Sequence, residues 1–338
     1  MATPRLITAI EDGALVLPPE GRILVLRPPA GTDLTPLPRD RVHIVHGFRP
    51  DHDHFAAAGY ATSVAPEGRY TLAIVRAPRS KDQARALLAS AAALTDGLLV
   101  LDGQKTDGID SLLKALRERV PVVTVLSKAH GKLIVTEGGD LSEWAIGPTT
   151  LPEGFLTAPG LFSADGVDPA SALLAKALPA KLGPKVADLG AGWGFLSRAI
   201  LERDGVSDLH VIEAEHDALT AARSNVADAR ATLHWADALN FAAESGFDDI
   251  VTNPPFHQGR SADPSLGRGF IAAAARLLAP QGRLWLVANR HLPYESSLKE
   301  TFSQVEDLPG SPAFKLYLAS RPKPPASRAA RRVARTRR

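Results

Sequence analysis

The sequence has 338 residues, of which 45% are hydrophobic and 22% charged, with a formal net charge of +2. It contains no cysteine, which excludes disulfides, thiolate metal sites and a thiolate nucleophile. The first residues lack the basic-then-apolar order of a secretion signal, and no apolar run reaches the roughly 18 residues of a membrane helix. We therefore expect a globular cytoplasmic protein of about two domains that makes no contact with a membrane.

The first half of the chain shows a weak alternation of strands and helices. Apolar runs predict strands at 22–26, 42–45, 71–75, 97–101 and 122–126, and amphipathic runs predict helices at 81–94 and 111–119. No glycine-rich loop follows these strands, so residues 1–148 are predicted to be an α/β domain without an obvious nucleotide site. The His and Asp residues between 43 and 54 match no zinc spacing, and we predict no metal site.

Residues 146–154 are rich in Gly and Pro and predict a linker. Beyond it, strands and helices alternate regularly, which predicts a parallel sheet covered by helices on both faces. The predicted strands are 185–189, 209–212, 232–235, 248–252, 283–288 and 314–319, and the predicted helices are 195–203, 216–225, 269–278 and 294–302. A short irregular stretch before the last strand would let that strand insert antiparallel. The second domain is predicted to span residues 155–320.

Residues 321–338 contain eight Lys and Arg residues and no acid, which leaves a net charge of −6 for the rest of the chain. The segment has almost no large apolar side chain, so it is predicted to be a disordered basic tail. Because Lys and Arg displace counterions from nucleic acid whatever its sequence, we expect this tail to contact RNA. The alternative is a tail that only aids solubility.

A glycine-rich loop follows the first strand of the second half. Gly190, Gly192 and Gly194 alternate with other residues between a predicted strand and a predicted helix, which allows a tight turn and close approach of a ligand. The dinucleotide fingerprint would place its third glycine at Phe195, so NAD is disfavoured. The sequence also lacks a phosphate loop for ATP or GTP. Asp188 places a carboxylate just before the loop.

Two further carboxylates follow the next two predicted strands. Glu213 ends the strand 209–212 and can accept hydrogen bonds from both ribose hydroxyls, as the acid of dinucleotide sites does. Asp237 follows the strand 232–235 and can accept from an adenine amine. Each acid alone is more often a solvated charge, but acids at three successive strand ends predict a nucleoside-binding site.

The segment Asn253-Pro254-Pro255-Phe256 follows the predicted strand 248–252. Two prolines cannot continue a sheet, and they leave a stiff loop with carbonyl groups available as acceptors. The Asn253 side-chain oxygen and the Pro254 carbonyl could both accept from one NH2 group, while Phe256 could stack on a base. The alternative is a rigid turn with a core phenylalanine.

Together, Asp188–Gly194 and Asn253–Phe256 resemble the motifs of class I S-adenosylmethionine-dependent methyltransferases that act on planar exocyclic nitrogens. Residues 155–320 resemble more narrowly the C type of the bacterial 16S rRNA guanine-N2 methyltransferases, which modify the small ribosomal subunit. The first half more loosely resembles the degenerate methyltransferase-like domain of such enzymes, best at Ser127–Lys132. The segments that carry the narrower resemblance are Pro159–Ser163 with Asp165, Gly166 and Asp168, then Phe256-His257-x-Gly259, Val287–Asn289 with Leu292–Tyr294, and Phe314-Lys315-x-Tyr317.

The resemblance implies an α/β fold with two tandem Rossmann-like class I methyltransferase domains, the N-terminal one degenerate. It also implies S-adenosyl-L-methionine as cofactor and the N2 amine of a guanine in 16S rRNA, or in the small ribosomal subunit, as target. A monomer acting as an intramolecular pseudo-dimer is expected. The implied catalytic residues are Asn253, Pro254 and Phe256. The implied cofactor-binding residues are Phe162, Ser163, Asp188, Gly190, Gly192, Gly194, Glu213, Asp237 and Asn253.

Other functions remain open at this point. The Asn-Pro-Pro-aromatic motif also serves methyltransferases that act on adenine N6 or protein glutamine, and a guanine of the large-subunit rRNA is a further possible target. From another class, the chain could be an inactive RNA-binding factor of ribosome assembly, although its intact Gly190, Asp237 and Asn253 argue against that.

Overall fold

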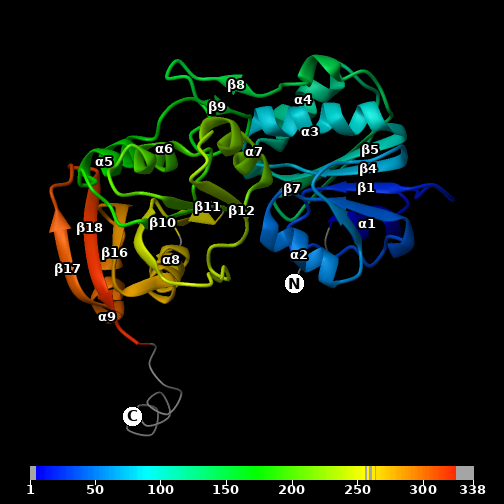
Figure 1. Ribbon diagram of the computed structural model, residues 1–338. Coiled ribbons are helices and arrows are strands. Elements are labelled where there is room, and N and C mark those ends of the chain that lie inside the picture. The colour runs from blue at the N-terminus through cyan, green and yellow to red at the C-terminus, as the bar shows by residue number, and fades with distance from the viewer. Residues whose placement is uncertain (1–4, 256, 259–260, 263, 325–338) are drawn as a thin grey trace, which may run out of the picture. The chain divides into compact units, whose positions relative to one another are not determined.

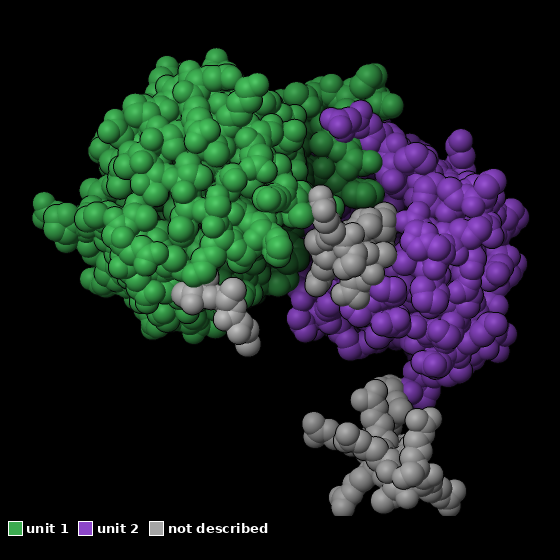
Figure 2. Space-filling view, turned by 180° about the vertical axis from the view of Figure 1, so that it is seen from behind, with its two compact units in different colours: residues 1–164, 215–217 green, residues 165–214, 218–338 purple. Residues whose placement is uncertain are grey.

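The computed structural model describes residues 5–255, 257–258, 261–262 and 264–324. The chain divides into two compact units, unit 1 with residues 1–164 and 215–217 and unit 2 with residues 165–214 and 218–338 (Figure 2). This division differs from the predicted one, because residues 155–164 cluster with unit 1. The predicted linker contains β8 (Thr149–Thr150), which pairs antiparallel with β9 (Leu156–Thr157). Gly160, with a φ of +88°, then lies against the amide end of the Gln83 side chain.

Unit 1 is built on a seven-stranded sheet with the order β3-β2-β1-β4-β5-β7-β6 (Figure 1). The first five strands in this order are parallel to their neighbours, while β7 is antiparallel to both β5 and β6. The strands are β1 (Ile23–Leu26), β2 (Val42–Val45), β3 (Ala61–Ser63), β4 (Tyr70–Arg76), β5 (Thr95–Gln104), β6 (Val122–Lys128) and β7 (Gly131–Thr136).

Helices cover both faces of this sheet. The helices α1 (Arg5–Glu11) and α2 (Arg49–Ala57) pack on one face, where Val25, Ile44 and Ile74 are buried. On the other face α3 (Lys81–Leu94) and α4 (Ile109–Arg117) cover Leu26, Val75 and Leu101. Side chains that alternate along one strand therefore reach two separate cores, as expected for a parallel sheet buried on both sides. No helix connects β1 to β2, because residues 27–38 form an irregular segment with prolines at 28, 29, 36 and 38.

Unit 2 is built on a second seven-stranded sheet with the order β12-β11-β10-β13-β16-β18-β17 (Figure 1). The first five strands are parallel, and β18 is antiparallel to both β16 and β17, which confirms the expected antiparallel insertion of the last strand. The strands are β10 (Lys185–Leu189), β11 (Asp208–Glu213), β12 (Ala231–Trp235), β13 (Phe247–Thr252), β16 (Leu278–Asn289), β17 (Phe302–Leu308) and β18 (Phe314–Pro322). A small hairpin joins β14 (His257–Gln258) and β15 (Ser261–Ala262).

The faces of the second sheet are also covered by helices. One core lies under α5 (Pro169–Ala177), α6 (Phe195–Leu201) and α7 (His216–Asn225), and the other lies under α8 (Pro264–Leu277) and α9 (Tyr294–Thr301). In the central strand β10, Val186 belongs to the first core, whereas Ala187 and Leu189 belong to the second. By this alternation the side chain of Asp188 points to the side of α6.

The tandem α/β architecture predicted from the sequence is confirmed, and the two sheets have the same strand order. One boundary needs correction, because β18 runs to Pro322 and thus includes two residues that the sequence assigned to the tail. Of the rest of the predicted tail, Lys323 and Pro324 have no regular secondary structure, and residues 325–338 lie outside the described residues. Within the described part of the chain, no helix is long and apolar enough to cross a membrane, and no three His, Asp or Glu residues are grouped so that they could hold a metal ion.

Candidate active site

The glycine loop joins the end of β10 to the start of α6, as the sequence predicts. The N–H groups of Gly190 and Ala191 both donate to the carbonyl of Ile212 at the end of β11, at 2.9 and 3.1 Å. Gly192 and Gly194 have φ values of +56° and +93°, a region that residues with a side chain rarely adopt. A side chain at Gly194 would collide with Val226, whereas no atom of the described residues lies within 4 Å of the position a side chain would take at Gly192. The main chain at Gly192 is therefore open to a ligand.

Glu213 and Asp188 flank this loop from two neighbouring strands. Glu213 Oε2 accepts from the N–H of Gly192 at 2.8 Å. Asp188 is fully buried, and its Oδ2 accepts from the hydroxyl of Ser197 in α6 at 2.7 Å. Burial, reinforced by the charge of Glu213 and opposed by the Ser197 hydrogen bond, raises the pKa of Asp188 to about 7. Its Oδ1 is buried and has no hydrogen-bond partner among the described residues.

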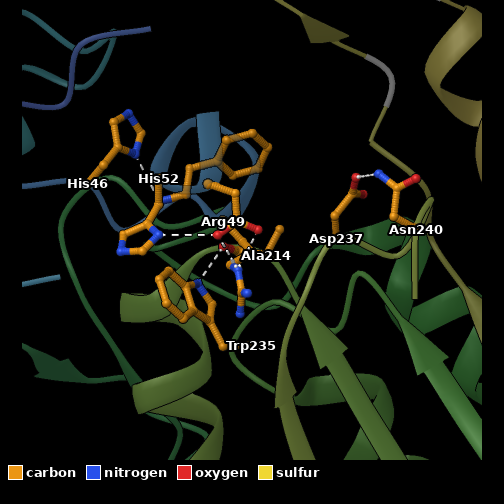
Figure 3. A network of polar contacts seen from close by, with 9 residues as sticks. His46, Arg49, His52, Ala214, Trp235, Asp237 and Asn240 are labelled. Atoms are coloured by element: carbon orange, nitrogen blue, oxygen red, sulfur yellow. Dashed lines mark hydrogen bonds and ion pairs between the residues drawn. The ribbon is translucent and has the colours of Figure 1, made fainter. Parts of the chain in front are cut away.

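Asp237 follows β12 at the same edge of the sheet (Figure 3). Its Oδ1 accepts from the N–H of Leu239 at 2.9 Å, and its Oδ2 accepts from Asn240 Nδ2 at 2.7 Å. Just before it, Trp235 Nε1 donates to the carbonyl of Ala214 at 2.8 Å (Figure 3). Asp188, Glu213 and Asp237 thus lie at the ends of three adjacent strands, as predicted, and three carboxylates at one edge favour a cationic ligand.

The Asn-Pro-Pro segment begins where β13 ends, beside the glycine loop. Leu189 of β10 pairs with Thr252 of β13, and the Thr252 hydroxyl donates to the Leu189 carbonyl at 2.8 Å. Both residues are buried completely. The half-buried Asn253 donates from Nδ2 to Asp168 Oδ2 and to Ser171 Oγ, each at 2.9 Å. Pro254 is buried.

These residues fit the cofactor that the sequence motifs imply. The open main chain at Gly192 and the buried, unsatisfied Asp188 Oδ1 are sites where a ligand can bind. Glu213 and Asp237 could accept hydrogen bonds from the ribose hydroxyls and the adenine amine of S-adenosylmethionine. The carboxylates of Glu213 and Asp237 also complement the positive charges of its sulfonium and ammonium groups.

Three predicted site residues are not placed in this cluster. Phe256 lies outside the described residues. Phe162, which is 56% exposed, and Ser163, which has a φ of +53°, belong to unit 1, whereas the glycine loop belongs to unit 2. Their proposed part in cofactor binding stays a prediction.

The sequence did not single out Ser197 or Ser171, which contact Asp188 and Asn253. Asp168 entered only as part of a resembling segment, without a role. A signal for Asp168 did exist, because an Asp followed by Pro and, three residues after the Asp, by Ser is typical of a capped helix start. No sequence pattern indicated its contact with Asn253, which lies 85 residues further along the chain.

Comparisons with known proteins place these features in a family. The family model of the methyltransferase small domain matches residues 153–318, the part of the chain that contains the glycine loop and the Asn-Pro-Pro segment. The ribosomal RNA small subunit methyltransferase C of Shewanella sp. (strain MR-7) is 31% identical over 265 residues, which cover 74% of this chain and 77% of that protein. The protein of the same name from Hahella chejuensis is 28% identical, over 89% of this chain and 94% of that protein.

A solved structure resembles both halves of the chain. The 16S rRNA N2 G1207 methyltransferase of T. thermophilus, in complex with AdoMet and guanosine, superposes with a TM-score of 0.76 and is 27% identical. The match covers 90% of each chain, so it includes the first domain as well as the second. The chain therefore belongs to the ribosomal RNA small subunit methyltransferase C family.

Proposed function

We propose that the protein transfers the methyl group of S-adenosyl-L-methionine to the exocyclic N2 amine of a guanine in 16S rRNA. The observation that carries this proposal is the pairing of β10 with β13, which places the glycine loop and the Asn253-Pro254 acceptors at the ends of adjacent strands. Neighbouring strands lie about 4.8 Å apart, so a methyl donor on one loop lies within reach of an amine on the other. Family membership and the guanosine complex of the T. thermophilus enzyme support guanine as the target.

The chain's own residues have two tasks in this reaction. S-adenosylmethionine, when bound, supplies a methyl group that its sulfonium already activates. The carboxylates of Glu213 and Asp237 and the open main chain at Gly192 bind and orient that donor. Asn253 Oδ1 and the Pro254 carbonyl accept hydrogen bonds from the two N–H groups of the target amine, and Phe256 is proposed to stack on the base. Positioning of this kind can lower the barrier by roughly 7–11 kcal/mol.

The two acceptors also act on the charge of the reacting nitrogen. In free guanine the N2 lone pair is delocalised into the ring. When Asn253 and Pro254 hold both N–H groups, the nitrogen can become more tetrahedral and its lone pair can point at the methyl carbon. As the new C–N bond forms and the methyl–sulfur bond breaks with its electron pair going to sulfur, positive charge grows on the nitrogen, and the two oxygens stabilise it. One N–H proton then leaves the nitrogen to water.

The proposal extends to the partners and to the first domain. We propose that the protein acts in the cytoplasm as a monomer, in which unit 1 is the degenerate counterpart of unit 2 and serves for RNA docking or for support of unit 2. The identical strand order of the two sheets supports this relation.

Analysis of rRNA from a strain that lacks the gene tests the target. One N2-methylguanosine should be missing from nuclease digests of its 16S rRNA and should return when the wild-type gene is restored. Restoring a gene with Asn253→Ala should leave it missing. If the 16S digests are unchanged and a large-subunit guanine, an adenine or a protein glutamine has lost its methyl group instead, the proposed target is wrong.

The basic tail is proposed to hold RNA without reading its sequence. Residues 325–338 contain six Arg residues, and a cut after Pro324 leaves β18 intact. For single-stranded RNA the salt slope of log K changes by about 0.7 for each phosphate that the protein no longer neutralises. A chain that ends at residue 324 should therefore bind a 16S rRNA fragment more weakly and with a flatter salt dependence. An identical slope for both lengths would leave the tail without this role.

A further inference from the structure

The side-chain amide of Asn253 is held on its nitrogen side by the start of α5. Nδ2 donates to Asp168 Oδ2 and to Ser171 Oγ, each at 2.9 Å. An amide nitrogen carries two protons, so these two bonds use both of them. Of the two ends of the amide, the carbonyl oxygen Oδ1 is thus the one that is left to face a substrate.

This orientation cannot easily reverse. If the amide turned by 180°, Oδ1 would lie where Nδ2 now lies, against the carboxylate of Asp168. Two acceptors without a proton between them repel each other, and the hydrogen bond to a charged partner would be lost. Asp168 therefore selects one of the two amide orientations.

Asp168 is itself fixed by the helix that it caps. It is the N-cap of α5, with φ of −62° and ψ of 127°, and its Oδ2 accepts from the N–H of Ser171 at 2.8 Å. The helix continues into the core of unit 2 through Leu174, which is fully buried. One carboxylate oxygen thus accepts hydrogen bonds from both the Ser171 N–H and the Asn253 amide. Because the helix fixes that oxygen, it also fixes the position of the amide.

We propose that Asp168 and Ser171 are positioning residues of the methyl transfer, which hold the Asn253 amide with Oδ1 facing the target amine. This inference rests on the proposed function, since it gives that oxygen its task. The negative charge of Asp168 also polarises the amide and makes Oδ1 a stronger acceptor. Ser171 completes the arrangement, because its hydroxyl accepts a hydrogen bond from the second N–H of Nδ2. Without Ser171, that N–H group would be free to turn toward the substrate.

Single-turnover methyl transfer tests the role in the reaction. Small ribosomal subunits from a strain that lacks the gene serve as substrate. Asp168→Ser keeps a good helix cap but is too short to reach Asn253, and it should slow transfer by about 10²-fold without changing the affinity for S-adenosylmethionine. Asp168→Asn keeps an acceptor oxygen and should restore most of the rate. Ser171→Ala should give a smaller loss.

A double-mutant cycle separates positioning from a general loss of structure. If Asp168 acts through Asn253, Asp168→Ser should cause no further loss in a chain that already has Asn253→Ala. Multiplied losses in the double variant, or an unchanged rate in Asp168→Ser, would overturn the inference. Thermal unfolding of Asp168→Ser and Asp168→Asn provides the control for the helix cap.

A spectroscopic measurement tests the clamp without any reaction. The chain has only four asparagines, Asn225, Asn240, Asn253 and Asn289, so selective 15N labelling gives four side-chain NH2 signals, and Asn253→Ala assigns the relevant one. In the wild type, exchange of the Asn253 NH2 protons with water should be slow, and Asp168→Ser should accelerate it while the other three signals stay unchanged. An unaltered Asn253 signal would overturn the clamp. A slow Asn253 signal in a protein that methylates no guanine would instead overturn the proposed function and leave the clamp intact.

Discussion

The two units share one strand order but differ at the strand ends that form the candidate site in unit 2. The register makes their residues comparable, because Leu26 of β1 pairs with Val45 and Val75, just as Leu189 of β10 pairs with Ile212 and Thr252. The residues that follow these strands can therefore be compared one by one. The differences show that the fold can persist while the chemistry at the strand ends is replaced.

The loop after the first strand differs most. In unit 2 the strand leads through Gly190 and its neighbours into α6, whereas in unit 1 the Gly190 position holds Arg27, with a φ of +54°, and no helix follows. Asp188 corresponds to Val25, which is buried in an apolar core. Unit 1 thus lacks both the helix start and the buried acid that border the open main chain of unit 2.

After the second strand of unit 1, β2, the position that corresponds to Glu213 holds a histidine whose partners all belong to unit 1. Where unit 2 has Glu213, unit 1 has the buried His46, whose Nδ1 accepts from the N–H of Phe48 at 3.0 Å and whose Nε2 faces Asp51 Oδ2 at 3.4 Å. Asp51 in turn accepts from the N–H of Ala30 at 2.9 Å. Burial and the nearby charge of Arg27 lower the pKa of His46 to about 3. A neutral, internally bonded histidine therefore occupies the place of a carboxylate.

The residue after the fourth strand is an asparagine amide in unit 2 but a member of an ion pair in unit 1. Arg76 stands in the position of Asn253 and is paired with Asp102, which also accepts from Arg5 Nε at 2.6 Å. Arg5 begins α1, just as Asp168 caps α5. In both units the residue after the fourth strand is thus linked to the helix that precedes the sheet, but only in unit 2 does the link engage an amide through its nitrogen alone.

Replacing Asn253 after β13 and, in a separate variant, Arg76 after β4 tests this contrast most strongly. Asn253→Ala removes one of two acceptors at the reacting amine and should lower the single-turnover rate by about 10²–10³-fold, by analogy with the loss of one group that stabilises transition-state charge. The affinity for S-adenosylmethionine, measured by calorimetry, should stay the same. Arg76→Ala should leave the rate of the folded protein unchanged, and equal losses in both variants would remove the functional difference between the units.

Changes at the second strand end should mainly affect cofactor binding. Glu213→Ala removes a carboxylate that would hold the ribose, and we expect the affinity for S-adenosylmethionine to fall by about 10–10²-fold, which corresponds to about 1.5–3 kcal/mol for hydrogen bonds to a charged group. Glu213→Gln keeps an acceptor for the Gly192 N–H and should retain more affinity. The control, His46→Gln in unit 1, should leave affinity unchanged. If Glu213→Ala binds as well as the wild type, Glu213 is only a cap for the loop.

Two glycines with positive φ allow a smaller, steric test. Gly192 in unit 2 has a φ of +56° and Gly154 in unit 1 a φ of +81°, and at both positions a side chain would meet no atom of the described chain within 4 Å. Alanine at either site should cost about 1 kcal/mol of stability. Gly192→Ala should in addition weaken cofactor binding, because its methyl group projects into the space left for the ligand. Calorimetry showing equal cofactor affinity for both variants would contradict the assignment of that space.

Two of the buried titratable groups, His46 and Asp188, predict opposite pH dependences. His46 has a pKa of about 3 in the fold against an ordinary value of 6.5, so its contribution to stability is present above pH 6.5 and is lost as the pH falls toward 3. Asp188 has a pKa of about 7 in the fold against an ordinary value of 3.8, so its contribution is present below pH 3.8 and is lost as the pH rises through 7.

Hydrogen exchange of peptides from β2 and β10, corrected for intrinsic rates, can follow each unit separately. Between pH 5 and pH 7, protection should rise in β2 and fall in β10. Asp188→Asn should remove the trend in β10 without affecting β2. Parallel trends in the two strands would show that these two groups do not control local stability.

The strands of unit 2 could be predicted because they are short apolar runs with clear breaks between them. β17 was missed, since it is an edge strand in which Gln304 and Glu306 are exposed, and an edge strand needs no apolar pattern on its outer side. The predicted linker missed β8 because a two-residue strand leaves no periodic signal. In unit 1, helix α2 was not predicted, because its His and Asp residues are typical of a polar loop.

The candidate site was predictable in its positions but not in its contacts. Strand ends followed by Gly, Glu, Asp and Asn mark the edge of a parallel sheet where ligands bind, and the sheet order brings them together. The hydrogen bonds that orient these groups join segments far apart in sequence, as between Asn253 and Asp168 or between Ser197 and Asp188. Such contacts depend on how the helices pack against the sheet. No local pattern in a single sequence shows that packing.

The buried Thr252 hydroxyl, bonded to the Leu189 carbonyl, has a consequence for evolvability. It joins the last residues of two adjacent strands directly before the loops that diverge from them. The spacing of the glycine loop and the Asn-Pro-Pro segment, which the proposed function assigns to the methyl donor and the nucleophile, is thereby set by the pairing of two adjacent strands. Sequence changes on surface helices, in the tail or in unit 1 leave this strand pairing unaltered.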